Sequence, residues 1–107
     1  MSRTFPAYFP KAKRQLESLG NRLREARLRR KIAASHFAER LGVSRDTLNR
    51  LERGDPAIAI GTYLTALTLL GLAMDFDLLA ANDTLGRRLQ DGELPARRKR
   101  TPVKSGG

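Results

Sequence analysis

Residues 41–54, LGVSRDTLNRLERG, contain the end of one helix and the start of the next within a few positions. Gly42 suits the position just past a helix, because glycine adopts a positive φ without a steric penalty. Ser44 can accept a hydrogen bond from the free backbone amides that open the following helix, and Val43 can pack on Leu48 across this start. The stretch therefore predicts two short helices joined by a tight turn.

The spacing of apolar residues predicts helices on both sides of this turn. From Lys11 onward, leucine and alanine recur at intervals of three and four and so line one face of a helix. Gly20 weakens this helix by about 1 kcal/mol relative to alanine and is a candidate for its start. No segment reads as a strand, so we expect an all-α fold. The other expected helices cover residues 34–41, 45–53, 60–70 and 75–81.

The two short helices around Gly42 meet the steric demands of a helix-turn-helix unit. Such a unit needs apolar residues toward the core, a small residue where the helices cross and a glycine in the turn. Ala38 is the small residue, four positions before the turn glycine. Because the second helix of this unit lies in the major groove of DNA, the sequence predicts a DNA-binding motif at about residues 34–53. The apolar positions are Phe37, Leu41, Val43, Leu48 and Leu51.

The formal net charge of +10 is unevenly distributed along the chain. Residues 1–53 carry a net charge of +9, residues 54–86 carry −4 and residues 87–107 carry +5. A clustered positive field attracts nucleic acid, because binding releases the counterions condensed on the phosphates. The two basic blocks therefore indicate a polyanionic partner. Solubility alone is the less favoured explanation of the charge.

The uncharged stretch 56–74 has nearly the length of a membrane-spanning helix. It begins at a proline, contains three threonines and two glycines, and is bounded by Asp55 and Asp75 instead of basic residues. A buried helix at a subunit interface therefore explains the stretch better than a membrane span.

Apolar residues in this region exceed what a small bundle needs for its own core. We expect part of the surplus to be buried in a homodimer, which would place two recognition helices about 34 Å apart on a palindromic DNA site. The alternative is that all of these side chains belong to the core of one chain. The candidate interface residues are Ile58, Ile60, Tyr63, Leu67, Leu70, Leu72, Met74 and Phe76.

Residues 20–54, and above all FAERLGVSRDTLNRLERGDP, resemble the helix-turn-helix regulators of the Xre/Cro/C1 type. This resemblance implies a five-helix bundle of the lambda-repressor-like DNA-binding type. The longer run through IGTYLTALTLLGL and LPARRKR is similar to the HipB-like antitoxins and related small regulators. That similarity implies a HipA-like serine/threonine kinase toxin as partner, with the pair binding its own promoter.

Groove geometry and this resemblance assign roles to side chains of the motif. The candidates for base readout are Arg45, Asp46, Asn49 and Arg50. Arginine can bond guanine at two acceptors, and asparagine can do the same with adenine. Asp46 can accept from a cytosine amine or can simply favour the positive end of its helix, and both alternatives stay open. The candidate phosphate contacts are Ser35, Ser44, Thr47 and Arg53.

The resemblance also implies a structural salt bridge between Arg27 of the first helix and Glu52 of the third. The sequence departs from the family pattern where helices begin. Ala33 and Ala34 stand where Ser-Gln is common, and Ala59 stands where a serine often caps the fourth helix. Each lost cap costs about 1 kcal/mol.

The same departure removes the usual glutamine contact to the DNA backbone. Ser35, Arg30 and Lys31 are the candidate substitutes for it.

The sequence has no arrangement of residues that suggests catalysis. His36 is the lone histidine, there is no cysteine, and no glycine-rich phosphate loop occurs. We therefore expect no enzyme activity, no cofactor, no bound metal and no membrane association, and we expect a cytoplasmic location. The expected function is a sequence-specific DNA-binding repressor, acting as the HipB-like antitoxin of a pair that autoregulates its promoter. The alternatives are a stand-alone Xre-family regulator, a toxin neutraliser with weak DNA binding and, less favoured, an RNA-binding protein.

The expected domain organisation has three parts. Residues 1–10 form an irregular N-terminal arm, residues 11–82 form the DNA-binding and dimerisation domain, and residues 83–107 form a basic flexible tail. The tail contains ARRKR at residues 96–100. Such a run is a solvated disordered segment, an arm for the minor groove or phosphates, or a segment that orders on a protein partner.

Overall fold

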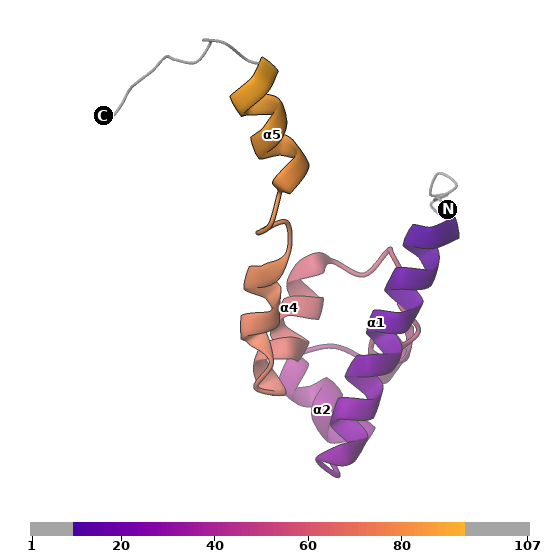
Figure 1. Ribbon diagram of the computed structural model, residues 1–107. Helices are drawn as coiled ribbons and strands as arrows, with labels where there is room; N and C mark the ends of the chain where they lie inside the picture. The colour runs from indigo at the N-terminus through magenta and orange to yellow at the C-terminus, as the bar shows by residue number, and fades with distance from the viewer. Residues whose placement is uncertain (1–9, 94–107) are drawn as a thin grey trace. The chain divides into compact units, whose positions relative to one another are not determined.

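The computed structural model describes residues 10–93, and every regular element within that range is a helix. The all-α prediction is therefore confirmed. The expected N-terminal arm lies outside the described residues except for Pro10, which is the first residue of α1. In chain order the elements are α1 (Pro10–Arg29), α2 (Ala34–Leu41), α3 (Arg45–Glu52), α4 (Ile60–Leu69), the 3-10 helix η1 (Ala73–Leu78) and α5 (Thr84–Glu93) (Figure 1).

Two helices differ from the sequence prediction. The expected helix over 75–81 is the 3-10 helix η1. Helix α5 lies in the segment from residue 83 that we expected to be flexible. The polar composition of that segment predicts no helix, but the segment contains a local signal for a helix start. Asp83 caps α5, because its Oδ1 accepts a hydrogen bond from the Gly86 amide at 2.9 Å.

The described residues fall into two compact units, one ending at Phe76 and one beginning at Asp77. In the first unit α3 packs on α1 and α2, and α2 also packs on α4 (Figure 1). Phe37, Leu48 and Leu51 are the largest side chains that are fully enclosed between these helices. The helix-turn-helix segment therefore supplies the centre of the core as well as an outer face.

The turn between α2 and α3 follows the local sequence closely. Gly42 has a φ of 76°, and its amide donates to the Glu39 carbonyl at 3.0 Å. The Val43 amide donates to the Ala38 carbonyl, also at 3.0 Å. This hydrogen-bond pattern closes the end of a helix around a left-handed residue. The helix end that the sequence predicted at Gly42 is thus confirmed.

Gly20 lies in the middle of α1 and does not mark its start, which corrects the sequence expectation. A Cβ at Gly20 would lie 2.7 Å from the backbone oxygens of Leu51 and Glu52. At Gly54, whose φ is +75°, a Cβ would collide with the backbone of Leu16. Glycine at both positions therefore lets α1 and the end of α3 approach with backbone against backbone.

Three residues that we expected in a dimer interface belong to the core of a single chain. Tyr63, Leu67 and Leu70 are 5%, 7% and 3% exposed, because they belong to the same buried cluster as side chains of α1, α2 and α3. The interface prediction is wrong for these three residues. The intramolecular alternative holds for them, since the chain itself already covers their side chains.

The other candidate interface residues are less enclosed. Ile58, Leu72 and Phe76 are half-buried against the core, whereas Ile60 and Met74 are 66% and 81% exposed. The uncharged stretch contains the ten-residue helix α4. Within residues 10–93, no helix has the length and hydropathy that crossing a membrane requires.

The starts of α2 and α4 are uncapped by side chains. Ala33 has an extended backbone with φ −64° and ψ 144°, and Ala59 is similar with φ −59° and ψ 142°. This is the geometry in which a serine would accept a hydrogen bond from the following amides. Both alanines are exposed, so a hydroxyl fits without loss of packing.

We expect Ala33→Ser and Ala59→Ser each to raise the free energy of unfolding by about 1 kcal/mol. Urea denaturation of each variant measures the effect. Ser44→Ala is the matched control and should lower the free energy of unfolding by about 1 kcal/mol, because Ser44 already accepts from the Thr47 amide at 3.0 Å. If either serine substitution lowers the free energy of unfolding, that position is not a helix start that lacks a side-chain cap.

Candidate nucleic-acid interface

Helix α3 begins at a side-chain cap. Ser44 has an extended backbone, its Oγ accepts from the Thr47 amide, and the same hydroxyl donates to Thr47 Oγ1 at 3.0 Å. Both residues were predicted as phosphate contacts. The Ser44 hydroxyl proton is used in this bond, so a phosphate would have to share or replace it, whereas Thr47 only accepts and keeps its own hydroxyl proton for donation.

The outer face of α3 is polar and open. Arg45, Asp46 and Asn49 are exposed, whereas Leu48 and Leu51 on the opposite face are buried. The buried leucines fix the rotation of the helix about its axis, because they occupy the centre of the core. Three of the four predicted base-reading residues therefore lie together on one accessible surface of α3, at its first two turns.

Arg50, the fourth predicted base reader, has a partner that the sequence analysis missed. Its Nε donates to Asp55 Oδ2 at 2.9 Å, and Oδ1 of the same carboxylate accepts from the Ala57 amide at 2.8 Å. The Ala57 hydrogen bond, together with that from Arg50, holds the pKa of Asp55 below its ordinary value. The signal in the sequence was an aspartate just past the helix-ending glycine, where it can reach back to the last turn.

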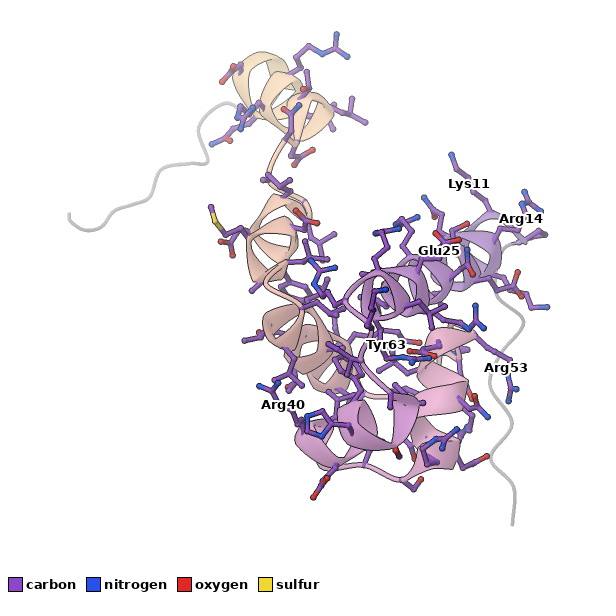
Figure 2. All side chains as sticks on the ribbon, turned by 90° about the horizontal axis from the view of Figure 1, so that it is seen from below. Lys11, Arg14, Glu25, Arg40, Arg53 and Tyr63 are labelled. Carbon is purple, nitrogen blue, oxygen red and sulfur yellow. The ribbon has the colours of Figure 1, made fainter. Side chains whose placement is uncertain are left out.

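The loop after α3 is attached to the core through Tyr63. The Tyr63 hydroxyl donates to the backbone carbonyl of Asp55 at 2.9 Å, and its ring lies inside the bundle (Figure 2). Burial, with a smaller contribution from the Asp55 charge, raises the pKa of Tyr63 to about 12. The phenol therefore keeps its proton and remains a hydrogen-bond donor.

Arg27 and Glu52 form a buried pair in the isolated chain. Arg27 Nε lies 2.7 Å from Glu52 Oε2, and Nη2 lies 3.0 Å from Oε1, so the contact is bidentate. The remaining terminal nitrogen donates to the Ile32 carbonyl at 2.9 Å. The hydrogen bond to Glu52 is the main reason that the pKa of Arg27 is raised. This pair joins α1, α3 and the loop before α2.

The remaining predicted phosphate contacts lie at the ends of the two short helices. Ser35 is exposed in the first turn of α2, and Arg53 is the exposed residue that ends α3. In Figure 2 Arg53 projects from the side of the view opposite to Arg40 of α2. Among the candidate substitutes for the missing glutamine, Arg30 donates to the Ala26 carbonyl at 2.9 Å, whereas Lys31 is exposed with a φ of 57°.

A family model described as a helix-turn-helix domain matches residues 18–79, which is more than half of the chain. The chain belongs to the helix-turn-helix domain family. The matched range includes α2, the Gly42 turn and α3, together with the core helices that support them. A comparison with curated proteins finds no match. The helix-turn-helix domain is of the Xre/Cro-like kind and supports the role of a DNA-binding regulator.

Proposed function

We propose that this helix-turn-helix protein is a sequence-specific transcriptional repressor that binds double-stranded DNA through α3. The observation that carries the proposal is the exposed polar face of α3, held outward by the Gly42 turn and the Ser44 cap. A helix presented in this way fits the major groove, where base edges can be distinguished. The proposed base-reading residues are Arg45, Asp46, Asn49 and Arg50.

The proposed phosphate contacts lie in or beside α2 and α3. Ser44 and Thr47 lie at the start of α3, Arg53 lies at its end, and Ser35 lies at the start of α2. Contacts to phosphate fix the position of the protein on the duplex without reading the sequence. The net charge of +9 over residues 1–53 supports this arrangement, because it attracts the duplex before specific contacts form.

We expect Arg45→Ala to weaken binding to a preferred duplex by about 1–3 kcal/mol, the usual worth of a bidentate arginine–guanine pair. The preferred duplex is first selected from a random-sequence pool by the wild-type protein. Affinity is then measured by fluorescence anisotropy at one fixed salt concentration.

Arg40→Ala is the matched control, since it removes the same charge from an exposed position of α2. It should weaken binding to the preferred duplex and to random duplexes equally, and only slightly. If the wild-type protein shows no preference for any duplex over random DNA, the proposed function is wrong. A wild-type protein that prefers structured RNA to duplex DNA would instead support the RNA alternative.

We further propose that the repressor acts as a homodimer on a palindromic site. The support is the exposure of Ile60 and Met74, two large apolar side chains that the first unit leaves in solvent. Ile58, Leu72 and Phe76, which are half-buried, would complete the interface. Sedimentation equilibrium of the purified protein tests this, and a monomer at concentrations that saturate the preferred duplex would rule it out.

A narrower proposal is that the repressor is the HipB-like antitoxin of a toxin–antitoxin pair. Its support is the similarity of the run through IGTYLTALTLLGL and LPARRKR to those antitoxins. The partner would be a HipA-like serine/threonine kinase, and the complex would bind its own promoter. Co-expression of the chain with a kinase encoded beside it tests the pairing by rescue of growth. A stand-alone regulator would show no such rescue while keeping its DNA binding.

A further inference from the structure

The hydrogen bonds around Arg50 leave one end of its guanidinium available. Nε is bonded to Asp55 Oδ2 at 2.9 Å. Among residues 10–93, neither terminal nitrogen of Arg50 has a hydrogen-bond partner, and the side chain is 39% exposed. Arg50 is therefore held at Nε, and its two terminal nitrogens, Nη1 and Nη2, are free to bind a ligand.

The open end is the part of arginine that recognises guanine. Two parallel N–H groups of a guanidinium match the O6 and N7 acceptors on the major-groove edge of guanine. Asp55 occupies only Nε, which an end-on contact of this kind does not use. The carboxylate and a guanine can therefore bind the same guanidinium at once.

Asp55 is itself held in place from several sides. Its Oδ1 accepts from the Ala57 amide at 2.8 Å, and its backbone carbonyl accepts from the buried Tyr63 hydroxyl at 2.9 Å. Its own amide donates to the Arg50 carbonyl at 3.0 Å. The carboxylate is thus a fixed point on the scaffold, and Arg50 is fixed by it.

We propose that Asp55 is a positioning residue that holds Arg50 ready to read a guanine in the major groove. The inference rests on the DNA-reading function proposed above. Arginine has many rotamers, and ordering such a side chain only on binding lowers affinity. A bond made before the duplex arrives removes that cost for the correct base. Asp55 therefore increases discrimination, although its negative charge opposes binding to DNA of any sequence.

These two effects have opposite signs and can be separated in Asp55→Asn. The asparagine carbonyl can still accept from the Ala57 amide, but its NH2 group cannot accept from Arg50 Nε. Removal of the negative charge should strengthen binding to every duplex. Loss of the held arginine should nevertheless reduce the preference for guanine over other bases at the position that Arg50 reads.

The experiment uses the full chain and the duplex that the wild-type protein selects from a random-sequence pool. Dissociation constants are measured on this duplex and on versions with each guanine replaced. We expect Arg50→Ala to abolish the preference at one guanine. Asp55→Asn should reduce the preference at that same guanine by about 2- to 10-fold, the range expected for ordering one flexible side chain. In the Arg50→Ala background, Asp55→Asn should cause no further loss of preference.

Glu39→Gln is the matched control, because it removes an exposed carboxylate from α2 without touching Arg50. It should strengthen binding in general and leave the guanine preference unchanged. An unchanged preference in Asp55→Asn would overturn the positioning role while leaving the proposed function intact. An equal loss at every base position, or a loss that persists in the Arg50→Ala background, would show a general distortion of α3 and would also overturn it. A wild-type protein that selects no sequence at all would refute the proposed function and this inference together.

Discussion

Glu52→Ala is expected to lower the free energy of unfolding by about 3–5 kcal/mol, the usual cost of removing one partner from a buried ion pair. The side chains of Arg27 and Glu52 are only 8% and 6% exposed, so water cannot replace the lost carboxylate at the guanidinium. The variant would leave a buried positive charge with the Ile32 carbonyl as its one remaining described partner. Urea denaturation followed by circular dichroism measures the loss.

The chain offers a matched control in a second ion pair. Lys13 and Glu17 lie 3.7 Å apart with side chains 70% and 52% exposed, so Glu17→Ala should change stability by about 0.5 kcal/mol or less. The double variant Arg27→Met with Glu52→Leu should be less destabilised than Glu52→Ala, because it leaves no charge unpaired in the core. If Glu52→Ala and Glu17→Ala cost the same, the buried pair is not what joins α1 to α3.

Gly20→Ala is expected to reverse the usual effect of this substitution in a helix. Alanine normally stabilises a helix interior by about 1 kcal/mol over glycine. At Gly20, however, the new Cβ would lie within 2.7 Å of backbone atoms of Leu51 and Glu52, which cannot rotate away. We therefore expect α1 to be pushed off α3, with a net loss of about 1–3 kcal/mol.

Gly61→Ala provides the comparison in the same domain. Gly61 lies in the first turn of α4, and a Cβ there would meet nothing within 4 Å. This variant should be stabilised by about 0.5 kcal/mol. In thermal unfolding, the midpoint temperature of Gly20→Ala should therefore lie below that of the wild-type protein, and that of Gly61→Ala should lie above it. A Gly20→Ala variant that is as stable as Gly61→Ala would show that the close approach of the two backbones is not required.

The sequence predicted the parts of the fold that depend on neighbours along the chain. The turn glycine Gly42 and the cap Ser44 were identified correctly, because both signals act through backbone hydrogen bonds a few residues away. The uncapped starts at Ala33 and Ala59 are confirmed by the same local geometry. The pairing of Arg27 with Glu52 came from a family resemblance and is confirmed at bidentate distance.

The sequence analysis failed where a residue's role depends on a partner from another element. Gly20 was interpreted as a weak helix position, but its role depends on the backbone of α3. Tyr63, Leu67 and Leu70 were assigned to a dimer because apolar character alone does not distinguish a core from an interface. Helix α5 was not predicted, because the polar composition of its segment indicated a flexible tail, although Asp83 caps the helix.

The sequence by itself determined where helices stop and start around residues 41–54 and which side chains face outward on α3. Those properties follow from local φ preferences, capping and periodicity, which act over a few residues. Only the tertiary structure decided that Arg50 is held by Asp55 and that α1 meets α3 backbone to backbone. Such contacts depend on how the helices pack, and the packing is fixed by the whole core at once rather than by any one segment.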